Sequence, residues 1–193
     1  DQPVWADASD LIERMNHLLD GKDAREDRHA PWIAQCRVWV DRYPVVIEAH
    51  YQTPDGKANI YAFYHELSKI LKENDIIVTT AGTARIAGAQ AIRFKKGQRF
   101  IVNVTAAPMG YCLPGAIGAS IANDRFPVTL VAADGGLQMN IQELQTIKHH
   151  RLPIRIIVVN NDGYHSIRQT QNAFFKGRSP IGIGEASGDL SFP

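Results

Sequence analysis

Two consecutive strand–turn–helix patterns in the second half of the chain constrain its fold more than any other feature. A short apolar run at 127–132 ends at Asp134-Gly135-Gly136, and residues 140–150 follow with apolar side chains at helical spacing. A second apolar run at 154–159 ends at a polar turn, 160–163, and precedes another helix-like segment. Short continuous apolar runs are typical of buried parallel strands. Because parallel strands point the same way, both polar turns should lie on one edge of an α/β sheet.

The two turns carry oxygen ligands suited to a divalent cation. Asp134 supplies a carboxylate, Asn161 an amide oxygen, and the backbone a free carbonyl, while Gly135 and Gly136 allow a tight turn and a close backbone approach. Such hard donors suit Mg²⁺, whose octahedral coordination is usually completed by phosphates and water. Ligands of open α/β sheets bind at the carboxyl ends of the strands, so we expect Asp134 and Asn161 to converge there. An ordinary Asp-Gly turn is the alternative interpretation.

The spacing of Asp134-Gly135-Gly136 and Asn160-Asn161 resembles the thiamine-diphosphate motif, a Gly-Asp-Gly followed by a later Asn-Asn. The segment QMNIQELQT at 138–146 is similar to the acetolactate synthase branch of this family, and the likeness extends over about 75–174. It implies a parallel sheet with helices on both faces, thiamine diphosphate as cofactor, and Mg²⁺.

One residue departs from the motif, because Ala133 replaces its first glycine. That position contributes backbone and not a ligand, so a methyl group should be tolerated.

The resemblance also implies which residues hold the cofactor. Backbone N–H groups at helix N-termini would bind the diphosphate. The residues in this group are Gly82, Thr83, Ala84, Gly135, Gly136, Tyr164 and His165. Asp134, Asn161 and the carbonyl of Gly163 are expected to bind Mg²⁺. The alternative to a cofactor-binding role for residues 82–84 is an ordinary strand–helix turn. The alternative for His165 is a solvent-facing or helix-capping side chain.

A second segment is implied to shape the cofactor. Met109, within Ala107-Pro108-Met109-Gly110, matches the apolar residue that forces the two cofactor rings into a bent V. Ala107 replaces a glycine, and its carbonyl would accept the aminopyrimidine hydrogen bond. A buried core methionine is the alternative for Met109.

Composition excludes several other classes of protein. The formal net charge is +1 and the apolar fraction is 45%, which give no case for nucleic-acid binding or disorder. No apolar stretch is long enough to span a bilayer. Cys36 and Cys112 lack metal or redox spacing, so we expect free buried thiols in a cytoplasmic protein. His149-His150 is interpreted as a solvated helix end and not as a metal pair.

The remaining elements are predicted from periodicity. Helices are expected at 8–19 (capped by Asp7 or Ser9), at 31–44, at 59–71, from 84, and at 113–122, with strands at 75–80 and 99–104. The inward face of the 59–71 helix is predicted to be Ile60, Phe63, Leu67 and Ile70. A charged connection is expected at 22–29.

The turn at 53–56 marks the predicted domain boundary. Residues 1–55 would be a helical linker or remnant of a preceding domain, and 56–193 the cofactor-binding domain. After 175 the pattern thins into glycines, so the domain is expected to be incomplete at its C-terminus.

The expected activity follows from the resemblance. It implies a transferase or lyase that decarboxylates a 2-oxo acid, pyruvate as donor, and ligates the product to a second carbonyl. A non-oxidative 2-oxo acid decarboxylase is the alternative within the family, and a silent cofactor-binding or interaction module is the alternative of another class. A nicotinamide dehydrogenase would need a G-x-G-x-x-G turn, which TAGTAR at 80–85 lacks.

The resemblance further implies a partner domain. In the family, the glutamate that activates the cofactor lies on a pyrimidine-binding domain of the same or a neighbouring subunit. The acidic residues near the predicted site are Asp134, Glu143 and Asp162, and none matches that glutamate. We therefore expect a half-site, inactive alone, that works in a homodimer or homotetramer.

Overall fold

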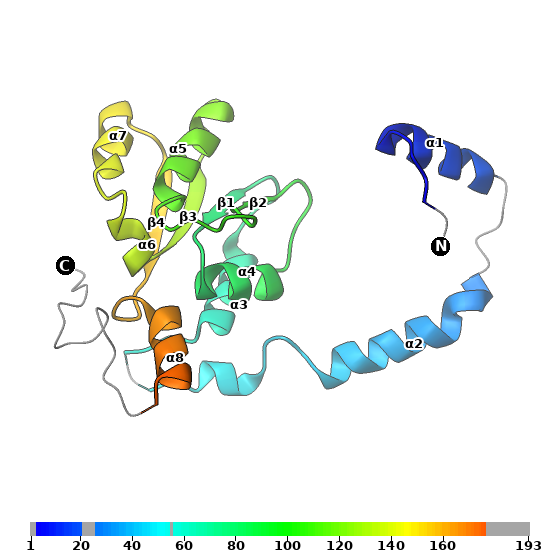
Figure 1. Ribbon diagram of the computed structural model, residues 1–193, viewed down its shortest axis with the longest axis horizontal. Helices are drawn as coiled ribbons and strands as arrows, with labels where there is room; N and C mark the ends of the chain where they lie inside the picture. Colours follow the sequence, from blue (N-terminus) through cyan, green and yellow to red (C-terminus); the bar gives the residue numbers. More distant parts are fainter. Residues whose placement is uncertain (1–2, 21–25, 55, 177–193) are drawn as a thin grey trace. The chain divides into compact units, whose positions relative to one another are not determined.

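The computed structural model describes residues 3–20, 26–54 and 56–176, and the chain divides into two compact units at Pro44 (Figure 1). The first unit contains α1 (Ala8–Leu19) and α2 (Glu26–Arg42). As predicted, Asp7 caps α1, its carboxylate accepting the N–H of Ser9 at 2.8 Å. α2 begins earlier than predicted, so Pro31 lies inside the helix and removes one backbone donor.

The second unit begins at Val45 and is built on a parallel four-stranded sheet of order β2-β1-β3-β4. Its strands are β1 (Ile76–Thr79), β2 (Arg99–Ile101), β3 (Val128–Ala133) and β4 (Ile154–Val159). The register of β3 and β4 runs from Val128 opposite Ile154 to Ala133 opposite Val159, so these strands end level. β2 is shorter than the predicted 99–104. The α/β fold with a parallel sheet is confirmed.

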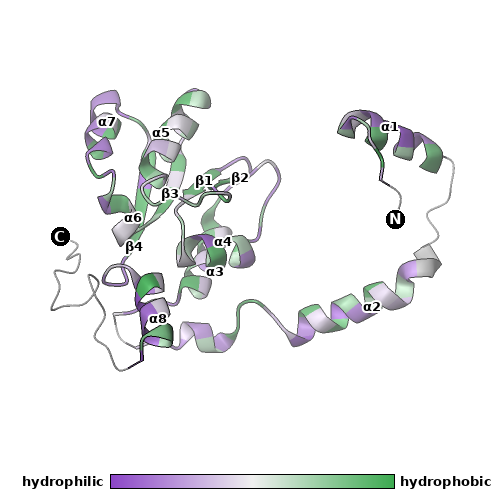
Figure 2. Cartoon of the chain, in the orientation of Figure 1, coloured by the Kyte–Doolittle hydropathy of each residue, from purple (hydrophilic) through white to green (hydrophobic). Residues whose placement is uncertain are grey.

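Helices cover both faces of the sheet, as predicted. The helices of this unit are α3 (Ile60–Ile70), α4 (Thr83–Ala91), α5 (Cys112–Ala122), α6 (Asp134–Gln138), α7 (Glu143–His150) and α8 (His165–Phe174), preceded by the 3₁₀ helix η1 (Glu48–Tyr51). On one face, α3 and α4 bury Tyr64 and Ala87 against Ile77. On the other, α5 and α6 bury Leu113 against Val78. Successive strand residues thus face opposite layers, and Figure 2 shows the strands as mainly hydrophobic.

Two predicted details of the helices are wrong. Ile70 is 75% exposed, because the buried stripe of α3 follows Tyr64, Leu67 and Leu71. The turn predicted at Asp134-Gly135-Gly136 is instead the first part of α6, and the helix predicted at 140–150 is shorter, because α7 begins only at Glu143.

The strand order creates a crevice at one point of the sheet. After β1 the chain crosses to β2 through α4, on one face, and returns to β3 through α5, on the other. The two connections therefore diverge where the carboxyl ends of β1 and β3 lie side by side. This reversal is the usual ligand position in open α/β sheets.

The other predictions concern surface and composition. Both cysteines are free, with Cys112 buried and Cys36 half-buried. Within the described ranges, no helix is long and apolar enough to cross a bilayer. The charged connection predicted at 22–29 is helical from Glu26, and its earlier part lies outside the described residues. Asp55 and the glycine-rich segment after 176 also lie outside them. The boundary at 55–56 stays a prediction.

Candidate functional site

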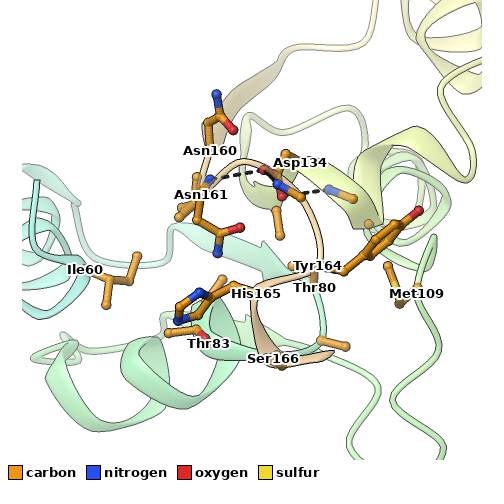
Figure 3. Close-up of a pocket in the computed structure, with 18 of the residues that line it drawn as sticks. Ile60, Thr80, Thr83, Met109, Asp134, Asn160, Asn161, Tyr164, His165 and Ser166 are labelled. Atoms are coloured by element: carbon orange, nitrogen blue, oxygen red, sulfur yellow. Dashed lines mark hydrogen bonds between the residues drawn. The ribbon is translucent and has the colours of Figure 1, made fainter. Parts of the chain in front are cut away.

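A cavity of about 500 Å³ occupies the crevice between the ends of β1 and β3. Residues 58–60, 80–84, 109, 133–136, 159–161 and 163–167 line it (Figure 3). The fold thus brings together all the predicted site residues except Ala107, which does not line the cavity. Its size is that of a small-molecule site.

Asp134 is the most tightly held side chain of the cavity. Its exposed fraction is only 1%. One carboxylate oxygen accepts the N–H of Gly135 at 2.7 Å, and the other accepts the N–H groups of Asn161 and Gly163 at 3.0 and 2.9 Å. The carboxylate therefore ties the end of β3 to the loop that follows β4, as the level strand ends require.

This carboxylate has no cationic side-chain partner. In the described part of the chain, no Lys, Arg or His forms an ion pair with Asp134. A buried carboxylate without a counter-charge is costly, although its three N–H donors offset part of that cost. The position is therefore suited to a bound cation.

Asn161 provides the second sign of a missing ligand. Its amide Oδ1 is buried and lacks a hydrogen-bond partner, the one such side-chain atom among the described residues. Figure 3 shows the Asn161 side chain directed from the loop into the cavity. Buried polar atoms are normally paired, so this oxygen is available to a ligand.

The loop 160–163 is fixed by its backbone. Asp162 and Gly163 have φ of 60° and 100°, in the left-handed region. The side chain of Asn160 accepts the N–H of Asp162 at 3.0 Å. The carbonyl of Gly163, predicted to bind metal, accepts the N–H of His165 at 2.8 Å and keeps a second lone pair. The backbone N–H of His165 is therefore already bound within the loop. Figure 3 shows the side chain of His165 at the cavity.

α4 begins at the cavity without a side-chain cap. Gly82, its N-cap residue, has φ 81° and ψ −150°, and no side chain bonds the first turn. This backbone region is essentially restricted to glycine. The first N–H groups of α4, from Thr83 and Ala84, lack intrahelical partners by position and lie beside the cavity, where they favour an anion.

The segment that carries Met109 is anchored to the loop between α6 and α7. Gly110 has φ 86°, and its carbonyl accepts Nδ2 of Asn140 at 2.8 Å. Met109 is 36% exposed and lines the cavity, so it is not a core methionine. Figure 3 shows it on the opposite side of the view from Ile60.

Close backbone packing also shapes the cavity floor. A Cβ atom on Gly136 would lie 2.7 Å from Oγ1 of Thr80, so only glycine fits there without a shift. The predicted close approach is therefore present, although a helix and not a tight turn provides it. Burial raises the pKa of the Cys112 thiol, which also hydrogen-bonds Thr80, and this keeps it protonated at neutral pH.

Sequence reasoning missed one wall of the cavity, formed by residues 58–60 at the start of α3. Asn59 caps α3, its side chain accepting the N–H of Tyr61 at 2.9 Å, and Ile60 faces the cavity. The cap was detectable from Asn59 ahead of an apolar helix. Its position at the site was not, because it depends on how α3 packs on the sheet.

These features fit a metal-bound diphosphate. No three His, Cys, Asp or Glu side chains gather to hold a metal anywhere in the described ranges, so a cation here would use carboxylate, amide and carbonyl oxygens. Such a donor set suits Mg²⁺, completed by phosphate oxygens. The uncapped start of α4 supplies N–H donors for the same anion.

Comparisons with known proteins agree with this geometry. A family model described as "Thiamine pyrophosphate enzyme, C-terminal TPP binding domain" matches residues 80–186. The chain is 29% identical over 180 residues to the acetolactate synthase isozyme 3 large subunit of Escherichia coli (strain K12), and 33% identical over 180 residues to the acetolactate synthase large subunit of Parasynechococcus marenigrum (strain WH8102). These alignments cover 92% of this chain but only 31% and 28% of the two relatives. The chain therefore spans less than a third of their length.

Proposed function

Because this chain belongs to the thiamine pyrophosphate enzymes, through their C-terminal cofactor-binding domain, we propose that it binds the Mg²⁺-diphosphate end of the cofactor in an acetolactate-synthase-like enzyme. The observation that carries the proposal is the pairing of a buried carboxylate that has no counter-charge with a buried amide oxygen that has no hydrogen-bond partner. Asp134 is buried without a cationic partner, and Asn161 directs an unpaired oxygen into the same cavity. One Mg²⁺ would satisfy both.

Each residue of the cavity then has a physical role. Asp134, Asn161 and the carbonyl of Gly163 would hold the metal, which neutralises the diphosphate. The N–H groups at the start of α4 would bind the phosphate oxygens, and the positive φ of Gly82 aims them. Gly135 and Gly136 let the start of α6 lie close to the ligand, since they add no side chain.

Met109 would position the reactive part of the cofactor. When bound, thiamine diphosphate supplies the electron sink for cleavage of a bond beside a carbonyl. The chain's contribution is alignment, because an apolar side chain at the cavity wall fixes ring orientation without adding charge. The anchor from Asn140 to Gly110 holds this segment in place.

For the whole enzyme we propose decarboxylation of a 2-oxo acid, pyruvate in the first instance, followed by ligation to a second carbonyl. A non-oxidative decarboxylase is the alternative within the family. The proposed partner is a pyrimidine-binding domain of the same or a neighbouring subunit, in a homodimer or homotetramer, because none of the acidic residues near the predicted site, Asp134, Glu143 and Asp162, matches the activating glutamate. A cytoplasmic location stays a prediction.

The test replaces the buried carboxylate in the full-length protein. Asp134→Asn should weaken Mg²⁺ binding in the presence of thiamine diphosphate by at least about 100-fold, since loss of even an outer-shell partner costs about 10- to 100-fold. Asp162→Asn is the matched control, because Asp162 is exposed on the same loop and does not line the cavity. Calorimetry should show the loss only in the first variant.

Two results would contradict the proposal. Equal affinity of wild type and Asp134→Asn would remove Asp134 from the metal site. A wild-type protein that binds neither Mg²⁺ nor thiamine diphosphate would support the silent module instead.

A further inference from the structure

Arg168 of α8 forms two hydrogen bonds to the backbone of the loop that carries Asn161. Its guanidinium donates through one nitrogen to the carbonyl of Asn161 at 2.6 Å and through another to the carbonyl of Asp162. Two successive peptide carbonyls are thus held by one planar fork. Arg168 belongs to none of the motifs described above, and the roles proposed for the cavity residues do not use it.

The inner side of the same loop is held by Asp134, whose carboxylate accepts the N–H groups of Asn161 and Gly163. The loop is therefore fixed from both sides, because the N–H groups of Asn161 and Gly163 bind Asp134 and the carbonyls of Asn161 and Asp162 bind Arg168 of α8. Two of its residues have positive φ, and for the non-glycine Asp162 this conformation is unfavourable. External hydrogen bonds are what keep such a backbone in place.

This double attachment fixes the direction of one side chain. With its N–H bound to Asp134 and its carbonyl bound to Arg168, the backbone of Asn161 has little freedom, and its Oδ1 remains buried, unpaired and directed into the cavity. Ligands of Mg²⁺ must meet a nearly ideal octahedral geometry, whereas Ca²⁺ accepts irregular sites. A rigid loop is thus more valuable for Mg²⁺ than for Ca²⁺.

We propose that Arg168 is a positioning residue for the metal site, which aims Asn161 at the cation by clasping the carbonyls of Asn161 and Asp162. The inference rests on the proposed function, because it assumes that Asn161 binds the metal. Arg168 contacts the loop backbone and acts on the metal only through it. Its planar fork is what the role requires, since a lysine ammonium cannot reproduce the paired geometry.

The experiment compares metal affinities in the full-length protein saturated with thiamine diphosphate. Arg168→Met should weaken Mg²⁺ binding about 10- to 100-fold, as removal of outer-shell partners does. Ca²⁺ binding should weaken much less, so the preference for Mg²⁺ falls. Arg168→Lys should lose most of the same affinity, although it keeps the charge. At saturating Mg²⁺, turnover should return close to the wild-type value.

Arg125→Met is the matched control, because Arg125 donates to a single backbone carbonyl, that of His150 at 3.0 Å, away from the cavity. It should leave both metal affinities unchanged. Equal loss of Mg²⁺ and Ca²⁺ affinity in Arg168→Met, or a similar loss in Arg125→Met, would mean general destabilisation and would overturn the proposal. Full Mg²⁺ affinity in Arg168→Lys would overturn it too, because charge alone would then suffice.

If Arg168→Met does not fold, Arg168→Lys decides the question by its Mg²⁺-to-Ca²⁺ preference. The outcome is separable from that of the proposed function. If the wild-type protein does not bind Mg²⁺ with the cofactor, the metal site itself is refuted. If the wild-type protein binds Mg²⁺ normally and the Arg168 variants bind it equally well, only the positioning role of Arg168 is refuted.

Discussion

Gly82 offers the sharpest test of the backbone at the cavity, because its substitution separates conformation from packing. A Cβ atom there would meet nothing closer than Oγ of Ser166, at 3.8 Å, so space is available. The φ of 81° and ψ of −150° are the obstacle. Alanine in this region costs about 1–3 kcal/mol, and its smaller unfolded-state entropy returns about 0.4–1 kcal/mol. Gly82→Ala should therefore destabilise the domain by roughly 1–2 kcal/mol.

The same chemical change at Gly118 should have the opposite sign. Gly118 lies in α5, is exposed, and a Cβ atom there would contact nothing within 4 Å. Because its backbone is helical, Gly118→Ala should stabilise by about 0.5–1 kcal/mol. The urea unfolding midpoints of both variants can be measured in the full-length protein with a spectroscopic probe placed in this domain.

Cofactor affinity adds a second readout to this comparison. Gly82→Ala should also weaken thiamine diphosphate binding, because the N–H groups of Thr83 and Ala84 are redirected, whereas Gly118→Ala should not. If Gly82→Ala were as stable as wild type, or if both variants changed stability in the same direction, the reasoning from φ and ψ would be refuted.

Two further predictions concern Met109 and Tyr64. Met109→Ala should leave Mg²⁺ affinity nearly unchanged but lower turnover roughly 10- to 100-fold, since alignment and not anchoring is lost; unchanged turnover would reduce Met109 to a packing residue. Burial raises the pKa of Tyr64 from 10.0 to about 12, so the unfolded chain releases this proton at a lower pH than the folded domain. As the pH rises from 10 to 12, the free energy of unfolding of the wild type should therefore fall by up to about 3 kcal/mol relative to that of Tyr64→Phe. Denaturant unfolding at several pH values measures both free energies, and a difference between the two proteins that stays constant with pH would contradict this.

The parts of the site that follow from strand direction were predictable. The apolar runs before Asp134 and Asn161 are short, continuous and bounded by polar turns, which indicates buried parallel strands. Parallel strands with level ends bring the residues after them together, and the hydrogen bonds from the N–H groups of Asn161 and Gly163 to Asp134 are the outcome. No further information was needed to place these three residues at one cavity.

The parts that depend on packing between distant segments were not predictable. The wall at 58–60 reaches the cavity only because α3 lies against the same sheet face as α4. The role of Arg168 depends on the direction in which α8 leaves the loop. Similarly, the predicted Phe63 packs against the core only partly buried, whereas contact with Ala87 and Ile77 buries Tyr64 completely.

The two alanines that replace glycines of the resembled motif show why a sequence departure must be judged by backbone conformation. Ala133 has φ −92° and ψ 150°, an ordinary extended conformation, so the methyl group there is tolerated without cost. Ala107 has φ 43°, in the left-handed region, where a non-glycine residue is disfavoured by about 1–2 kcal/mol. The same replacement is therefore neutral at the metal turn and strained in the segment that carries Met109. That strain persists because the anchor between Gly110 and Asn140 holds the segment from its other end.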